Sequence, residues 1–525
     1  MKRNLLVLVA AVLLASSAHA KTFTDKTFMN VRSTTVNQPM QLATWHDQFK
    51  KDEDKCGTSL QAVGFFQQST NAKDLGKYFS SSAKVAQANA PLGFIKDFIA
   101  TNNVANSDAQ FFTQDIFHTA VATAENYAAR TLSSKIQFRP EHSAAGLRLD
   151  WNQRLDKITD GLFLRVTLPV TNVQTKMGIS NVTPEVAQNL AGALPAADTN
   201  VALAAALTGA AKKFSDYLNG DVVNAQINSA QAALAKAKIN SASHSKTAVA
   251  DLDVMLGYQV YEKNDHRIGL NVAFTAPTGN KSTGEFVFEP ISGNGNHWAL
   301  GAGVDAEFRM WTDKKNEDRS LAFLAVLDYR YLFQATEMRT ASFNYRDNTG
   351  VYAQQEMRPY LLGGKIQVAN AAGNALFPLA NVLTRDHNVT PGSMVQMMAS
   401  FALNWDAFVL DLGYNLYYRE DEKVSVRAWT DGVYGPILPE FNTVNAVTEA
   451  SFQGGVAGLG SIRSTDLIAI GTPSQLTHKL FAGVGYTFRD CEYPVMLGFG
   501  GHYEFASDNS AVEAWGINGK IGVSF

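Results

Sequence analysis

The last fifteen residues of the chain alternate between large apolar side chains and polar or small ones. One parity carries Trp515, Ile517, Ile521, Val523 and Phe525, whereas the other carries glycine, asparagine, lysine and serine. An alternation with period two is typical of a β-strand whose two faces meet different media. The end of the chain is therefore predicted to be a strand with one face against an apolar environment and the other against a polar one.

The same alternation recurs along the chain and predicts about twelve strands, with twelve to sixteen possible, at residues 58–68, 145–152, 161–172, 250–261, 268–274, 298–309, 321–331, 393–405, 408–420, 475–488, 495–505 and 511–525. Most of these segments reach roughly the 9–11 residues that a tilted membrane-spanning strand requires. Strands of soluble proteins are usually about five or six residues long. Taken as antiparallel neighbours, the strands have short polar links at one end and long insertions at the other. The sequence predicts an all-β fold, a transmembrane antiparallel β-barrel over residues 58–525.

The C-terminal residue, Phe525, has apolar residues two and four positions before it, at Val523 and Ile521. In this respect the strand resembles the closing strand of the outer-membrane β-barrels of Gram-negative bacteria, in which a terminal aromatic residue is the usual assembly signal. The resemblance implies a porin-like protein of the cell outer membrane.

Residues 1–20 have the features of a secretory signal peptide. Lys2 and Arg3 precede an apolar run, and Ala18 and Ala20 form a small-residue cleavage site before Lys21. Neither this run nor any later stretch reaches the roughly 18–20 apolar residues of a spanning helix. We interpret the polar residues 21–57 as a periplasmic N-terminal segment, either a solvated tail or a plug folded into the barrel mouth.

Four long insertions are expected to form extracellular loops, at residues 69–143, 173–248, 334–392 and 421–474. Residues 91–100 and 108–130 have apolar side chains at helical spacings. The alanine-rich blocks 201–211 and 230–237, within the insertion 183–242, favour helix by intrinsic propensity. We therefore expect helices in these loops, and the role of the alanine-rich insertion stays open between a lid, a constriction and a contact surface.

The chain has two cysteines, Cys56 and Cys491, whose spacing suits no metal motif. In the predicted topology both lie at the periplasmic end, next to strands that closure of the barrel brings together. We expect them to lie near each other, either as a disulfide, which an oxidising compartment permits, or as two unpaired thiols.

The inward-facing positions carry many charged side chains, which we expect to line the pore: Arg148, Asp150, Arg165, Asp251, Asp253, Arg267, Asp305, Glu307, Arg309, Asp328, Arg330, Asp411, Arg419, Lys479, His502, Glu504 and Lys520. So many charges require either water or mutual pairing, because an isolated charge in a low dielectric is very costly. If they face water, the pore admits small polar solutes by passive diffusion with weak ion selectivity, as the resemblance to porins implies. If they pair across a narrow barrel, the pore is closed. We favour the open pore.

The alternative function is a surface-exposed structural or adhesion barrel, whose helical loops bind a partner while the pore is closed. A channel for hydrophobic substrates is disfavoured because it needs an apolar pocket and a plug. An enzyme is not expected, since His502 beside Glu504 has no accompanying nucleophile or metalloprotease motif.

We predict no cofactor and no bound metal. The formal net charge of −3 at pH 7 and the lack of a long basic run argue against a nucleic-acid partner. The expected partners are outer-membrane lipid, small polar solutes and further copies of the chain in a homo-oligomer.

Overall fold

The computed structural model describes residues 22–23, 26–46, 57–79, 110–115, 131–181, 218–221, 232–263, 266–316, 318–346, 352–357, 359–360, 362–365, 377–436, 462–489 and 492–525. The signal peptide, both cysteines and the helices expected at residues 91–100 and 201–211 lie outside these ranges. The expectations for them stay predictions.

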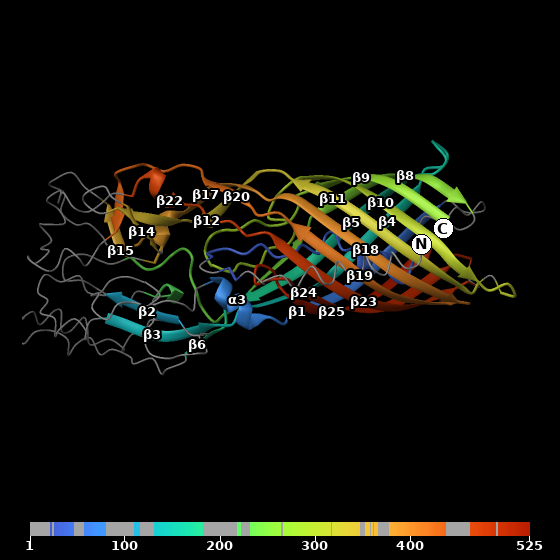
Figure 1. Cartoon of the computed structure of the whole chain (residues 1–525), viewed down its shortest axis with the longest axis horizontal. Helices are drawn as coiled ribbons and strands as arrows, with labels where there is room; N and C mark the ends of the chain where they lie inside the picture. The colour runs from blue at the N-terminus through green and yellow to red at the C-terminus, as the bar shows by residue number, and fades with distance from the viewer. Residues whose placement is uncertain are drawn as a thin grey trace, which may run out of the picture.

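Twelve long strands form a closed barrel (Figure 1). They are β1 (Thr58–Ser69), β4 (Glu141–Arg154), β5 (Leu162–Lys176), β8 (Leu252–Lys263), β9 (His266–Ala276), β10 (Ala299–Thr312), β11 (Ser320–Leu332), β18 (Gly392–Trp405), β19 (Phe408–Arg419), β23 (Gln475–Phe488), β24 (Val495–Ala506) and β25 (Ala514–Ser524). Each pairs antiparallel with its neighbours, and β25 pairs with β1 from Ser59↔Ser524 to Ser69↔Ala514. A further strand, β7 (Ser243–Val249), pairs with the second half of β5, whose first half pairs with β8. It therefore lies in line with β8 and does not add a strand to the circumference of the barrel. The predicted twelve-stranded antiparallel barrel is confirmed.

The outer surface of this barrel is apolar on all sides. Large exposed side chains lie on strands all around it, among them Leu147, Leu256, Val272, Leu300, Leu412, Leu480, Phe499 and Ile521. Rings gather where the chain ends, with Phe408 and Phe488 each in contact with Tyr486 at centroid distances of 4.8 and 4.7 Å. An apolar surface of this extent is stable where lipid covers it, and closure leaves no backbone group unpaired at a sheet edge in hydrocarbon. The chain is a Gram-negative outer-membrane type of β-barrel.

The two ends of the barrel differ (Figure 1). Short turns join the strands at the end where the chain terminates, which we call the turn end. The insertions leave the other end, the loop end, where the chain adds four small sheets built from β2 (Gln110–Asp115), β3 (Thr131–Phe138) and β6 (Ile179–Asn181); β12 (Ala335–Thr340), β17 (Thr384–Thr390) and β20 (Lys423–Val426); β13 (Ser342–Arg346), β14 (Tyr352–Met357) and β22 (Leu467–Ile468); and β15 (Leu362–Lys365), β16 (Phe377–Pro378) and β21 (Tyr434–Pro436).

Helices are few and short in the described part of the chain: α2 (Gln38–Leu42), α3 (Ala72–Phe79), α7 (Ala380–Leu383) and the 3-10 turn η5 (Ser464–Asp466). None of the described helices is long and apolar enough to cross a membrane.

The predicted loops 69–143 and 334–392 contain helices α3 and α7, but the helices expected at residues 108–130 and 230–237 are wrong where the structure describes those segments. Within the segment 108–130, residues 110–115 form strand β2, which pairs with β3 from Gln110↔Ile136 to Asp115↔Thr131. Within the block 230–237, residues 232–237 are irregular, and Asn381 binds their backbone at Ala233 and Ala235. Long-range hydrogen bonds to other loops satisfy the backbone there, and they override the helix propensity of alanine.

An apolar cap closes the loop end. Its buried core joins the start of the chain to the insertions and includes Met29, Leu75, Tyr78, Phe79, Phe138, Met177, Leu218, Ile239, Phe288 and Tyr360. Tyr78 Oη donates to the carbonyl oxygen of Phe28 at 2.8 Å, and Tyr360 Oη to that of Ala237 at 2.9 Å. The chain is thus anchored at the loop end before its first barrel strand begins.

His387 on β17 is expected to make this end of the molecule acid-sensitive. Its side chain is fully buried, and Nδ1 donates to the carbonyl oxygen of Arg385 at 2.8 Å. Burial lowers the pKa of His387 to about 4. The hydrogen bond to Arg385 and the negative charge of Asp386 act to raise this pKa, whereas the positive charges of Arg339 and Arg385 act to lower it further. Because the folded pKa lies below 6.5, the stabilisation by neutral His387 is complete above pH 6.5 and is lost as the pH falls towards 4.

Hydrogen exchange of residues 384–390, corrected for intrinsic rates, tests this at pH 7 and near the folded pKa. Protection should fall on acidification in the native chain and stay constant in His387→Gln. Equal loss of protection in both chains would contradict the assignment to His387.

Candidate functional site

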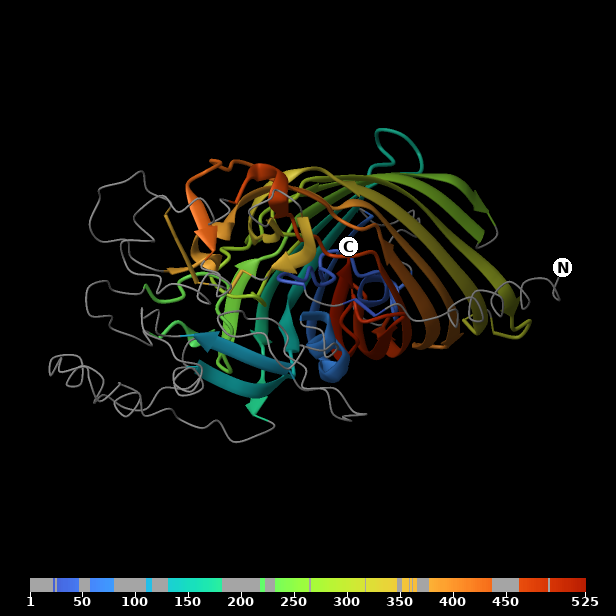
Figure 2. The ribbon, with the colours of Figure 1, turned by 60° about the vertical axis from the view of Figure 1, so that its left-hand side comes forward.

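The N-terminal segment runs through the inside of the barrel from the loop end to the turn end (Figure 2). At the loop end the backbone N–H of Asn30 donates to Thr472 Oγ1 at 3.0 Å. At the turn end the carbonyl oxygen of His46 accepts a hydrogen bond from Arg267 at 3.3 Å. All residues between 26 and 46 are buried or half-buried. We call residues 26–46 the plug.

The outer half of the plug is held through Arg32. One guanidinium nitrogen lies 2.6 Å from Glu504 Oε1. Another donates to Gln396 Oε1 at 2.9 Å and to Asn415 Oδ1 at 2.8 Å. Lys479 Nζ lies 3.0 Å from the second oxygen of Glu504. The Glu504 carboxylate therefore binds one cation of the wall and one of the plug.

In the middle of the plug, cations of the wall donate to its backbone. Arg148 Nη1 donates to the carbonyl oxygen of Thr35 at 2.9 Å. Lys520 Nζ donates to the carbonyl oxygens of Gln41 and Ala43, at 2.9 and 2.6 Å. These two buried cations donate hydrogen bonds to the backbone of the plug, whereas in an open pore they would donate to water.

The inner end of the plug is fixed by Asp411 on β19. One carboxylate oxygen accepts a hydrogen bond from the backbone N–H of Thr44 at 2.6 Å, and the other lies 2.8 Å from His46 Nε2. The Asp411 side chain is fully buried, so these contacts replace the water that an ionised carboxylate requires.

Thr44 and Trp45 lie against inward-facing glycines that we call the glycine patch: Gly483, Gly485, Gly498 and Gly522. A Cβ atom at position 498 would lie 2.4 Å from Thr44 Oγ1, and one at position 522 would lie 2.1 Å from the Trp45 ring. Thr44 itself has a φ of 68°, a left-handed conformation that is costly for a β-branched residue. The patch is shaped to receive the inner end of the plug.

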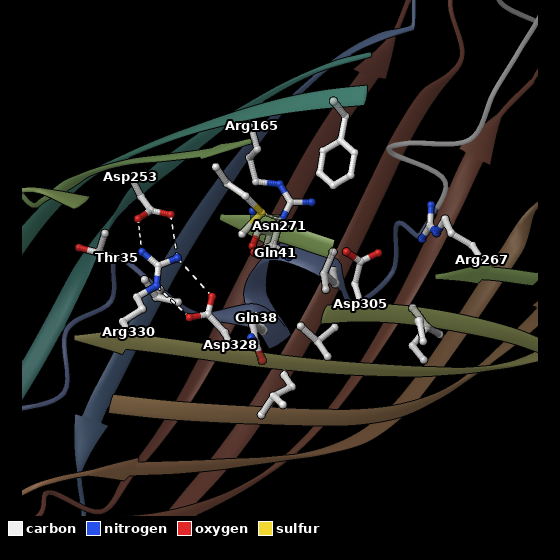
Figure 3. A pocket seen from close by; sticks show the side chains of 18 of the residues that line it. Thr35, Gln38, Gln41, Arg165, Asp253, Arg267, Asn271, Asp305, Asp328 and Arg330 are labelled. Atoms are coloured by element: carbon white, nitrogen blue, oxygen red, sulfur yellow. Dashed lines mark hydrogen bonds and ion pairs between the residues drawn. The ribbon is translucent and has the colours of Figure 1, made fainter. Parts of the chain in front are cut away.

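Several of the predicted pore-lining charges pair along the wall. Arg330 lies between two carboxylates, with Nη2 at 3.1 Å from Asp253 Oδ2 and Nε at 2.9 Å from Asp328 Oδ1 (Figure 3). Arg148 Nε lies 3.0 Å from both oxygens of Asp150. Arg148 and Asp150 neutralise each other, whereas Arg330 offsets one of the two negative charges beside it. This pairing reduces any field across the lumen.

The other predicted wall residues have varied surroundings. Arg267 lies 2.9 Å from Glu307, and Arg419 lies 2.5 Å from Glu422 at the loop end. Asp251 accepts hydrogen bonds from Asn294, from the backbone N–H and from Nδ2 at 2.7 Å each, and so draws the loop 277–298 inward. Arg165 donates to Asn152 at 2.8 Å. Asp305 and Arg309 are half-exposed, and His502 is buried beside Gly516.

The open lumen favoured from the sequence is wrong for this structure, because the plug and the loop 277–298 occupy the space. Alternation identified which side chains point inward, but it contains no information on what fills the interior. The plug contacts of Arg32, Thr44 and His46 were missed for that reason. The inward glycines of β23–β25 were the available signal, since a wall facing only water does not need them.

Among the residues that the structure describes, no group of three or more His, Cys, Asp or Glu side chains could hold a metal ion. The site therefore consists of charged and amide side chains around a segment of backbone, an arrangement suited to hydrogen bonding.

No family model and no curated protein matches the chain. Among solved structures, the chain is similar to an outer membrane channel from Pseudomonas putida F1, at 11% identity and a TM-score of 0.34 over 89% of this chain and 95% of that one. It is similar to the Pseudomonas putida toluene transporter TodX, at 8% identity and a TM-score of 0.32 over 96% of this chain and 99% of that one. It is also similar to a Pseudomonas aeruginosa FadL homologue, at 8% identity and a TM-score of 0.30 over 95% of this chain and 99% of that one. The class of this barrel rests on its own strand pairing and lipid-facing surface.

Proposed function

We propose that the chain is an exported outer-membrane channel that its own N-terminal segment holds closed, and that it admits small solutes when the plug moves. The observation that carries the proposal is the chemistry of the contacts between plug and wall. Four wall residues, Glu504, Arg148, Lys520 and Asp411, bind the plug through hydrogen bonds and ion pairs. It follows that the state described is closed and that opening requires a change in the plug.

Polar contacts of this kind support movement better than an apolar core would. When such a contact breaks, water replaces it, so each intramolecular hydrogen bond has a net value of only about 0.5–1.5 kcal/mol. The plug also makes apolar contacts: Met29 lies in the core of the apolar cap, and in the middle of the barrel Met40 packs with Phe65, Ala144 and Val173. A plug held in this way can leave the inner wall while the barrel, stabilised by its own strand pairing, stays folded.

Single-channel recording in planar bilayers tests the proposal. The native chain should show rare openings, and a chain lacking residues 26–46 should show frequent ones, because the plug fills the described lumen. Heat-modifiable migration in gel electrophoresis would establish that both chains are folded barrels. Silence from folded barrels of both kinds would overturn the channel proposal.

A second candidate is a surface-exposed structural barrel with a permanently closed pore. The apolar cap and the four small sheets at the loop end favour it, because they enlarge the surface beyond the membrane. Under this alternative, removal of the plug produces no conductance, and protease treatment of intact cells abolishes partner binding. The two candidates therefore predict different conductance for the chain without residues 26–46 in the same bilayer recording.

A further inference from the structure

A cavity of about 40 Å³ lies between the plug and the wall formed by β4, β5 and β8–β11 (Figure 3). A buried water needs at least about 10–15 Å³ measured in this way. The cavity therefore has room for roughly three water-sized groups, or for a solute of three to four non-hydrogen atoms. Gln38 borders it from the plug, and Asn271 and Asp305 border it from the wall.

Two of these side chains are buried without the hydrogen bonds that they need. Gln38 is 4% exposed, and neither Nε2 nor Oε1 has a partner among the described residues. Asn271 is 7% exposed, and its Oδ1 likewise has no partner within the described part of the chain. A buried polar group without a hydrogen bond is destabilising, so these atoms are suited to bind a small hydrogen-bonding molecule.

The local backbone keeps this cavity open. Asn271 lies opposite Gly303 and Asp305 lies opposite Gly269 in the pairing of β9 with β10. A Cβ atom at position 303 would lie 2.8 Å from Asn271 Oδ1, and one at position 269 would lie 2.7 Å from Asp305 Oδ1. Each polar side chain can therefore lie flat over a glycine. Gln38 is held from the other side as the first residue of α2.

The unsatisfied atoms of Gln38 and Asn271, together with the Asp305 carboxylate beside them, define the chemistry of a matching solute. Asn271 Oδ1 and the Asp305 carboxylate accept hydrogen bonds, so they require N–H or O–H donors. Gln38 offers one donor and one acceptor side by side, which requires the same pair on the solute. The cavity is bordered by Arg148, Arg165, Arg267 and Arg330 and by Asp253, Asp305 and Asp328. Because Asp150 pairs with Arg148 and Glu307 pairs with Arg267, these guanidinium groups leave no excess positive charge. An uncharged solute is therefore favoured over an anion.

We infer that this cavity is a binding subsite for small uncharged solutes with a hydrogen-bond donor and acceptor on neighbouring groups, as in a primary carboxamide or a urea. The inference deepens the proposed channel function, because it names a solute class that the closed state holds. The solute amino group would donate to Asn271 and Asp305, and its carbonyl oxygen would accept from Gln38 Nε2.

Saturation-transfer NMR on the full chain in lipid nanodiscs tests the subsite, with acetamide as the probe. Acetone and acetate are the matched probes, since all three molecules have one methyl group or more and the same number of non-hydrogen atoms. Acetone has no donor, and acetate has no donor and carries a charge. The native chain should give an acetamide signal about tenfold stronger than either matched probe, the ratio expected when one hydrogen bond is lost.

Two variants test whether the acetamide signal comes from this cavity. Gln38→Leu and Asn271→Leu should each weaken acetamide binding about tenfold. Gln259→Leu is the matched control, because Gln259 is also buried on the wall, also lacks described partners and does not border the cavity. It should bind acetamide as the native chain does.

Equal signals from the three probes in the native chain, or no signal above background, would overturn the subsite and leave water as the only occupant. The comparison of probes needs no variant, so a variant that fails to fold does not affect it. Channel activity in bilayers is measured separately. Selective acetamide binding by a silent barrel would retain the subsite and reject the channel, and conductance without binding would do the reverse.

Discussion

Replacement of Arg330 by methionine is expected to destabilise the barrel by about 3–5 kcal/mol. Arg330 is 1% exposed and is the cation that lies between Asp253 and Asp328. Thr275 Oγ1 donates to Asp253 at 2.7 Å but carries no charge. Without the guanidinium, two buried carboxylates face each other across a space that methionine fills with apolar atoms. Breaking such a group leaves uncompensated charge, which costs far more than the intact group contributes.

Equilibrium unfolding in urea from lipid bilayers measures this effect. Arg489→Met is the matched control, because Arg489 pairs with Asp318 at 2.6 Å where both side chains are about half exposed, so its loss should cost only about 0–1 kcal/mol. Adding Asp253→Asn and Asp328→Asn to Arg330→Met should restore much of the stability, since the repulsion is removed. A single Arg330→Met variant as stable as the control would refute the view that this cluster supports the wall.

Replacement of Gly522 by leucine is expected to open the closed barrel while leaving it folded. A Cβ atom at this position would lie 2.1 Å from the Trp45 ring, so the larger side chain and the inner end of the plug cannot occupy the same space. Overpacking of this kind costs about 1–3 kcal/mol. If the cost falls on the closed state alone, the ratio of open to closed channels rises about five- to 150-fold.

Gly519→Leu is the matched control for this experiment. Gly519 lies on the same strand and is exposed, and a Cβ atom added there would meet no other atom within 4 Å, so leucine only enlarges the lipid-facing surface. Single-channel recording should show frequent openings for Gly522→Leu and native behaviour for Gly519→Leu. If both variants stay closed and both migrate as folded barrels, Trp45 does not hold the channel shut.

Prediction from the sequence succeeded in the barrel strands, where the two-residue alternation shows which face of the strand each side chain lies on. The alternation around Leu410 and Leu412 identified a lipid-facing row and, between them, Asp411 as inward. Prediction failed in the loops because their local spacing of apolar residues does not distinguish a helix from a strand. Apolar spacings near Phe111 fit a helix as well as a strand, and only the pairing of β2 with β3 decides between them. The pairing of Cys56 with Cys491 lies outside the described residues and stays a prediction.

The sequence by itself determined the barrel fold and the side of each strand that meets lipid, because the alternation of apolar and polar residues can be seen within each strand alone. It left the strand number between twelve and sixteen, and the pairing of the strands in the structure gives twelve. Only the tertiary structure decided what the lumen contains. Arg32 meets Glu504 across 472 positions of sequence, and Thr44 meets Asp411 across 367. A charge that faces inward can be satisfied by water, by another charge or by a folded-back segment. That choice depends on which groups closure of the barrel brings together.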